Sequence, residues 1–159
     1  MNTANDLGAL RQRLLALLGA ERELVKKFIE LLNEEREILL QPDMEPLFGL
    51  AERKGQLARQ LDQLATVRSG ILTQARVTAD REGIEQFVGK AHLATWQDFL
   101  AVVTQARDLN VANGRIITER LKHNHQALAF LMAHADQPAT YGPDGVSRMR
   151  PGSRILGSV

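Results

Sequence analysis

Apolar residues recur along the first forty positions at alternating steps of three and four residues. A second apolar row with a seven-residue spacing lies beside the main row and widens the apolar face. The main row contains Leu7, Leu10, Leu14, Leu17, Leu24, Phe28, Leu31 and Ile38, and the second row contains Leu18, Val25, Leu32 and Leu39. This pattern predicts an amphipathic helix that meets more than one neighbour. Asn5 or Asp6 can cap its start, and Pro42 ends it.

Two further long helices are predicted after the first. The second has Asp43 as its cap and Pro46 in its first turn, and its heptad pattern continues to about Ala79. Residues 80–92 contain two glycines and a short apolar group, which predicts a connector with one or two helical turns. A third heptad pattern runs from Leu93 to about Ala135 and predicts a helix roughly 60 Å long.

The dipeptide Asn113-Gly114 lies between apolar residues of the third pattern and is also typical of a hairpin turn. The heptad passes through it, and Ile117 resumes the pattern in register. Because the period decides between helix and strand for short ambiguous segments, we expect a helix here.

Polar residues interrupt each heptad pattern. Glu21 and Glu35 do so in the first helix, and Lys54 and Arg68 do so in the second. We expect the two carboxylates either to lie where the apolar face turns toward solvent or to meet Lys54 or Arg68 across an interface.

In the third helix, four residues stand at positions where the heptad would place an apolar side chain, namely Arg107, Asn110, Gly114 and Asn124. Two interpretations are open. The polar residues can control register, because a buried asparagine penalises wrong alignments of the helices. Alternatively, they weaken the middle of a bundle so that it opens to admit an apolar helix from a partner.

Three long helices, modest connections and no strand pattern predict an all-α fold. We expect a long antiparallel, coiled-coil-like three-helix bundle with a short connector helix between the second and third helices. We predict that residues 1–136 form the bundle domain and that residues 137–159 form an irregular, flexible C-terminal tail. The tail holds the single tyrosine, three of the five prolines and four of the 12 glycines.

Composition excludes several classes of function. The chain has 20 Lys and Arg against 19 Asp and Glu, so no overall field favours nucleic acid or an anionic membrane. It has no cysteine, which excludes disulfides and cysteine zinc sites. The N-terminus lacks the basic segment of a signal peptide, and no apolar run approaches the ~20 residues of a membrane span. A cytoplasmic location is therefore expected.

Candidate catalytic or metal-binding patterns are also missing from the sequence. His123 and His125 are two residues apart, so on a helix they point to nearly opposite sides and cannot jointly hold a metal ion. The glycines form no phosphate-binding loop, and no serine or threonine lies in a nucleophile elbow. We expect a protein that is not an enzyme and that holds no cofactor and no metal.

A leucine-rich helix pair, the segment WQDFLAVVTQARDLNVANGRIITERLKHNHQALAFL and then ATYGPDG with a short basic tail occur in this order. Together they resemble the FlgN type of flagellar export chaperone. The resemblance covers nearly the whole chain in helix order and length. Its most specific residues are Asn110, Asn113, Gly114, Ile117, Leu121, Leu128, Tyr141, Gly142, Asp144 and Gly145.

The resemblance implies a cytosolic, non-enzymatic protein that binds the C-terminal helical segments of hook-associated (hook-filament junction) proteins. Such a protein keeps them soluble and delivers them to the flagellar type III export gate and its ATPase apparatus. The family's substrate-binding surface lies toward the C-terminal part, which on this chain means the residues named above together with Leu131. The tail region around Tyr141 is associated with the export gate.

A coiled-coil adaptor or scaffold is the alternative function. It would act by homo-oligomerisation through the second apolar row of the first helix. Neither function involves nucleic acid or stable membrane insertion.

Overall fold

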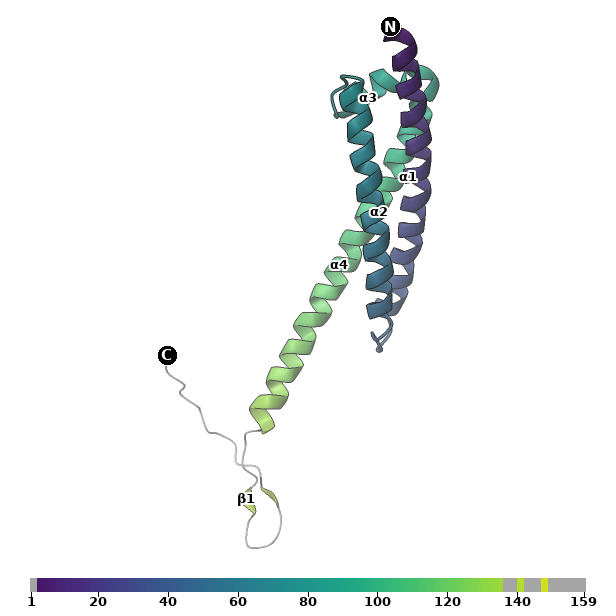
Figure 1. Ribbon diagram of the computed structural model, residues 1–159. Coiled ribbons are helices and arrows are strands. Elements are labelled where there is room, and N and C mark those ends of the chain that lie inside the picture. The colour runs from purple at the N-terminus through teal and green to yellow at the C-terminus, as the bar shows by residue number, and fades with distance from the viewer. Residues whose placement is uncertain (1–2, 136–139, 142–146, 149–159) are drawn as a thin grey trace, which may run out of the picture. The chain divides into compact units, whose positions relative to one another are not determined.

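A computed structural model describes residues 3–135, 140–141 and 147–148 of the chain (Figure 1). Its ordered structure is almost entirely helical, so the predicted all-α class is confirmed. The four α-helices are α1 (Thr3–Leu39), α2 (Leu47–Gln74), α3 (Arg81–Val88) and α4 (Leu93–Ala135). A 3₁₀ turn, η1 (Lys90–His92), precedes α4. Within the described part of the tail, β1 (Thr140–Tyr141) pairs antiparallel with β2 (Ser147–Arg148).

The chain divides into two compact units, Met1–Ile117 and Thr118–Val159. The first contains α1, α2, α3 and the first part of α4, and the second contains the rest of α4 and the strand pair. The domain boundary that the sequence places at residue 136 stays a prediction. Among the described residues, none of the helices has the length and apolar content that a bilayer crossing requires.

The start of α1 differs from the prediction. Asn5 and Asp6 lie inside the helix, which already includes Thr3, so neither residue is its cap. Asp6 lies in the first turn, where a carboxylate interacts favourably with the partial positive charge of a helix N-terminus. The predicted end is confirmed, because α1 stops at Leu39, before Pro42.

The start of α2 also corrects the prediction. Asp43 is not the cap of the helix: its Oδ1 accepts a hydrogen bond from the N–H of Glu45 at 2.9 Å in the turn that precedes α2. Pro46 occupies the cap position itself. Proline is suited to this place because the first N–H groups of a helix have no intrahelical acceptor.

The end of α2 comes at Gln74 rather than near Ala79. Arg76 adopts the left-handed conformation with φ of 57° and donates its N–H to the carbonyl of Thr73 at 3.0 Å. The N–H of Val77 reaches back to the carbonyl of Leu72 at 2.9 Å. This pair of bonds is a Schellman motif, which glycine usually forms. Arginine at that position hides the helix end from a sequence reading.

The predicted connector and third helix are confirmed. Asp80 caps α3 by accepting a hydrogen bond from the N–H of Gly83 at 2.7 Å. Gly89 ends α3 with φ of 76°, a conformation that side-chain-bearing residues rarely adopt. Helix α4 then runs without a break through residues 110–117, so the Asn-Gly pair does not form a hairpin.

Helices α1 and α2 lie side by side and antiparallel (Figure 1). Ion pairs show the direction: Glu34 near the end of α1 pairs with Arg53 near the start of α2, with an Oε2–Nη1 distance of 2.8 Å. Helix α3 lies near the start of α1, where the Arg11 guanidinium donates a hydrogen bond to the Phe87 carbonyl at 2.7 Å.

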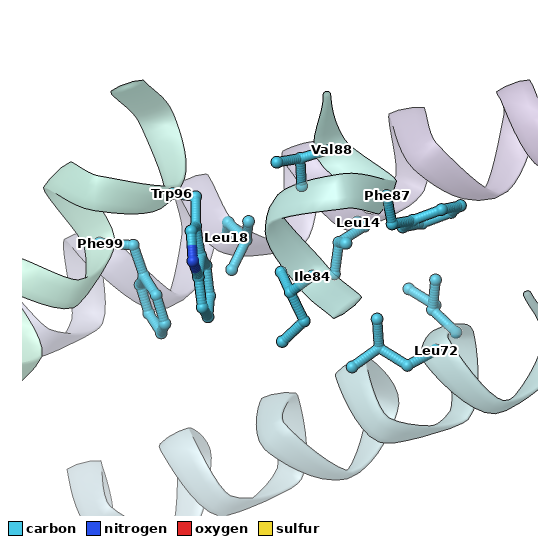
Figure 2. Packing of buried hydrophobic residues seen from close by; sticks show 9 residues of the cluster. Leu14, Leu18, Leu72, Ile84, Phe87, Val88, Trp96 and Phe99 are labelled. Atoms are coloured by element: carbon cyan, nitrogen blue, oxygen red, sulfur yellow. The ribbon is translucent and has the colours of Figure 1, made fainter. Parts of the chain in front are cut away.

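The main core forms where α1, α2, α3 and the start of α4 meet. Figure 2 shows side chains of α3 among those of α1 and α2, with Trp96 and Phe99 of α4 stacked beside them at 5.6 Å between ring centroids. The buried residues of this main core are Leu14, Leu18, Ile71, Leu72, Ile84, Phe87, Val88, Trp96 and Phe99. A second cluster contains Val25, Ile29, Leu32 and Ala106, and it continues the contact between α1 and α4.

All four residues of the second apolar row of α1 are buried inside the chain, namely Leu18, Val25, Leu32 and Leu39. This confirms that the apolar face of α1 meets more than one neighbour. It also removes the surface through which the adaptor alternative was expected to dimerise.

Candidate partner-binding surface

Of the heptad row predicted on α4, Trp96 is buried near the start of the helix, and the residues buried farther along belong to the row beside it. Phe99, Ala106 and Asn113 are buried, whereas Arg107 and Asn110 are exposed. Two polar contacts hold this buried face of α4 against α1 and α2.

The first such contact is a polar layer formed by Glu35, Lys54 and Asn113. The Lys54 Nζ lies 3.1 Å from both carboxylate oxygens of Glu35. The Asn113 amide donates to Glu35 Oε2 at 2.9 Å and to the Leu32 carbonyl at 2.7 Å. Since Asn113 is 0% exposed, it links α4 to the ion pair of α1 and α2 in a region without solvent.

The second polar layer contains Glu21, Arg68 and Phe99. The guanidinium of Arg68 forms an ion pair with the buried carboxylate of Glu21. It also lies over the Phe99 ring, 5.5 Å from the centroid, in a cation–π contact. This layer thus joins α1, α2 and α4, like the first.

The two layers repeat with the period of the heptads. Glu21 and Glu35, Lys54 and Arg68, and Phe99 and Asn113 are each two heptads apart in the sequence. The predicted meeting of Glu21 and Glu35 with Arg68 and Lys54 is confirmed. The spacing of the four charges could have revealed both layers, but nothing in the sequence marks Phe99 and Asn113 as their third members.

Between α2 and α4 lies an open, mostly apolar groove, which we call the α2–α4 groove. Its volume is about 540 Å³. Val25 and Phe28 of α1 contribute to its lining, together with Ala58 and Leu61 of α2 and Phe99 and Val103 of α4. No local motif in the sequence marks this groove, because its residues come from three helices.

The second unit contains an exposed apolar stripe on α4, formed by Leu121, Leu128 and Leu131. These side chains are 50%, 55% and 64% exposed. They lie on one face of the helix, since their spacing follows the helical repeat. Three exposed leucines on one face are typical of a surface that binds another apolar helix.

The other residues expected at the binding surface are distributed differently. Asn110 and Gly114 are exposed, Ile117 is half-buried, and Asn113 is buried in the first polar layer. Tyr141 belongs to β1, and its side chain lies outside the described part of the chain. Gly142, Asp144 and Gly145 lie outside the described residues altogether.

Charge is unevenly distributed along the chain. Residues 1–114 contain 14 Lys and Arg against 16 Asp and Glu, whereas residues 115–159 contain six against three. The exposed stripe therefore belongs to a basic segment and the α2–α4 groove to an acidic one. In the described portion of the chain, no group of three His, Cys, Asp or Glu residues is arranged to hold a metal ion.

Comparison with known proteins places the chain among flagellar proteins. The model of the FlgN protein family matches residues 1–148. The chain is similar to the flagella synthesis protein FlgN of Yersinia enterocolitica, with 26% identity over 148 residues, 92% of this chain and 95% of the relative. A second relative, of the same name and from serotype O:8, biotype 1B of that species, is 25% identical over the same shares of both chains. No solved structure matches the chain.

The first polar layer can be tested by replacing Asn113 with alanine. The substitution removes two buried hydrogen bonds, one to the Leu32 carbonyl and one to Glu35 Oε2, so we expect the free energy of unfolding to fall by about 1–3 kcal/mol. Urea unfolding followed by circular dichroism measures the change. The matched control is Asn110→Ala on the exposed face of α4, which should stay within about 0.5 kcal/mol of the wild type. Equal losses in the two variants would contradict the role of Asn113.

The second layer should make stability depend on pH. Burial raises the pKa of Glu21 above its ordinary value of 4.5, and Arg68 offsets this only in part. The folded state therefore keeps the Glu21 proton to higher pH than the unfolded state does. Stability is highest below the unfolded pKa and declines as pH rises from there through the folded pKa. The free energy of unfolding of the wild type, measured relative to that of Glu21→Gln, should therefore fall between about pH 4 and about pH 7.

Glu23→Gln is the control for this pH dependence. The hydrogen bond from Lys26 lowers the pKa of the exposed Glu23, so this carboxylate should stabilise the fold more as pH rises, the opposite sign. Urea unfolding of the wild type, Glu21→Gln and Glu23→Gln at both pH values gives the change in unfolding free energy that each carboxylate causes. Trends of the same sign for both variants would show that burial of Glu21 is not the cause.

Proposed function

We propose that this chain, which belongs to the FlgN family, is a flagellar export chaperone that binds the C-terminal helical segments of hook-associated proteins. It keeps these segments soluble and delivers them to the type III export gate. The family match over residues 1–148 and the names of the two relatives support a role in flagellar assembly. The exposed stripe of α4 is the structural observation that most directly supports the chaperone function.

The length of α4 supports this use of its last turns. Asn113 of α4 is hydrogen-bonded to Leu32 of α1. Helix α1 ends at Leu39, about two turns later, whereas α4 continues for about six turns to Ala135. Leu128 and Leu131 in these last turns are exposed, and a helix from another protein can bury them.

An amphipathic substrate helix fits this surface physically. Burying a leucine completely contributes about 1.5–3 kcal/mol, so three half-exposed leucines supply enough free energy to hold a helix reversibly. A chaperone needs reversible binding, because its substrate must leave for export. The substrate helix gains by covering an apolar face that would otherwise self-associate.

In this proposal the first unit is a rigid holder. We infer that α1, α2 and the first part of α4 act as the up-down-up three-helix bundle expected from the sequence. Both polar layers tie α4 to the other two helices. The four polar residues for which the sequence left register control open are exposed, namely Arg107, Asn110, Gly114 and Asn124. The buried asparagine that can fix the register of α4 is Asn113 instead.

The tail completes the proposal as the part that contacts the export gate. Tyr141 is the leading candidate there, followed by Gly142, Asp144 and Gly145. The last residues are basic, with Arg148, Arg150 and Arg154 and no acid after Asp144. Such a strip can dock on an acidic surface of the gate or fold over a partner.

Substrate binding is tested by Leu128→Glu. A carboxylate on the exposed stripe should weaken binding of the C-terminal helices of hook-associated proteins by at least about tenfold, which corresponds to 1.4 kcal/mol. The melting temperature should change little, because the side chain is 55% exposed. Isothermal titration calorimetry measures the affinity. Leu40→Glu, at a similarly exposed leucine outside α4, should bind like the wild type; unchanged binding by Leu128→Glu would refute the stripe as the substrate surface.

Delivery to the export gate is tested by removing residues 137–159. We expect nearly unchanged thermal unfolding but weaker secretion of hook-associated proteins, because the helices end before the tail. Tyr141→Ala should show a milder secretion defect, measured by the amount of hook-associated protein in the culture medium. A large fall in melting temperature on deletion would instead make the tail part of the fold.

A further inference from the structure

The α2–α4 groove lies in the first unit and takes no part in the binding proposed for the exposed stripe. Apolar side chains line most of it, and the small Ala58 and Ala65 on the α2 side are one heptad apart. Residues at this spacing share one face of a helix, and their small side chains let another helix approach closely. The groove therefore has the form of a site for one additional helix.

The length of the groove fits a short helix. Its lining runs along α2 from Ala58 to Arg68 and along α4 from Trp96 to Val103. At ~1.5 Å per residue the α2 side measures about 15 Å, which is the length of about ten helical residues or three turns. A three-turn segment is therefore enough to fill the groove.

Two buried polar atoms at the groove lack partners. Trp96 and Glu21 both line the groove, and their side chains are 5% and 2% exposed. Among the residues that the structure describes, Trp96 Nε1 and Glu21 Oε2 have no hydrogen-bond partner. A buried polar group without a partner costs free energy, so an occupant that accepts from Trp96 and donates to Glu21 is favoured. The side-chain amide of Asn or Gln offers both an acceptor and a donor.

The charges of the lining restrict the occupant further. Two carboxylates, Glu21 and Asp62, line the groove together with one guanidinium, that of Arg68. Arg68 already forms an ion pair with Glu21, which leaves Asp62 as an exposed carboxylate on the wall. An acidic residue on the apolar face of the occupant would meet charge of the same sign, so a face with an amide and no acid is complementary.

The tail of the same chain is poorly suited to this place. Residues 137–159 contain three of the five prolines and four of the 12 glycines. Proline and glycine are the residues that least favour a helix. The helix that fits the groove therefore comes from another protein.

We propose that the α2–α4 groove holds a three-turn amphipathic helix of a hook-associated protein, with an Asn or Gln in its apolar face and no acidic residue there. This inference rests on the proposed function, in which the substrate supplies more than one helical segment. One segment occupies the stripe, and a second, shorter one occupies the groove. Two linked contacts retain the substrate more tightly than either alone, while each contact by itself stays reversible.

The fluorescence of Trp96 tests the inference on the full chain. Trp96 is the single tryptophan and lines the groove, so its emission reports occupancy. Overlapping, tryptophan-free peptides from the C-terminal helical segments of hook-associated proteins are the probes. One of them should shift the emission, and replacing its Asn or Gln with Glu should abolish the shift. Emission that no peptide changes, or that shifts with the concentration of the chain alone because a second copy fills the groove, would overturn the inference.

Two variants test the groove from opposite walls. Ala58→Arg blocks it from an exposed position on α2, and Val103→Glu adds an acid on the α4 side. Each should weaken binding of the intact hook-associated protein at least about tenfold in isothermal titration calorimetry. Gln63→Arg, on the opposite face of α2, is the matched control and should bind like the wild type. Circular dichroism checks that all three variants remain helical.

The groove and the proposed function fail in different ways. Leu128→Glu disrupts the stripe and leaves the groove intact, so the peptide that shifts Trp96 emission should bind this variant as it binds the wild type. If Leu128→Glu loses the intact substrate while Ala58→Arg and Val103→Glu bind it normally, only the groove is overturned. If the wild type binds no hook-associated probe at all, the proposed function is refuted, and the inference fails with it.

Discussion

Buried charge pairing between α1 and α2 is the constraint on which the rest of the structure depends. Buried Glu35 of α1 forms an ion pair with Lys54 of α2. Buried Glu21 of α1 forms an ion pair with Arg68 of α2, and the two pairs are two heptads apart along each helix. A buried carboxylate without a partner strongly destabilises the folded state. The favoured alignment of α1 and α2 is therefore the one that gives each carboxylate a cation. Such pairs add little net stability compared with apolar residues. Their main effect here is to select one register.

The register of the pair then determines how α4 packs. Glu35 presents an acceptor to Asn113, and Arg68 presents its cation to the ring of Phe99. These two contacts hold the buried face of α4 that contains Phe99, Ala106 and Asn113. As a result, Val103 is left on the wall of an open groove. The groove is thus a consequence of the same polar contacts that hold α4.

Much of the candidate site was visible in the sequence, and some of it was not. The leucines of the stripe follow the heptad, so periodicity found them, but periodicity cannot tell a buried leucine from an exposed one. The heptad pattern placed Asn110, rather than Asn113, on the apolar row of α4, but Asn110 is exposed and Asn113 is buried. Asn113 donates hydrogen bonds to the Leu32 carbonyl and to Glu35. Which of the two asparagines faces α1 depends on how α4 is rotated about its axis.

The sequence by itself determined the helices, most of their limits, and the charges that must meet across α1 and α2. These follow from local periodicity, from prolines that end helices and from the cost of burying a lone carboxylate. The sequence did not predict the end of α2 at Gln74, because the residue that takes the left-handed conformation after it, Arg76, is not a glycine. Only the tertiary structure decided which residues of α4 are buried, because hydrogen bonds from Asn113 to α1 and a cation–π contact between Phe99 and Arg68 of α2 hold that face of the helix.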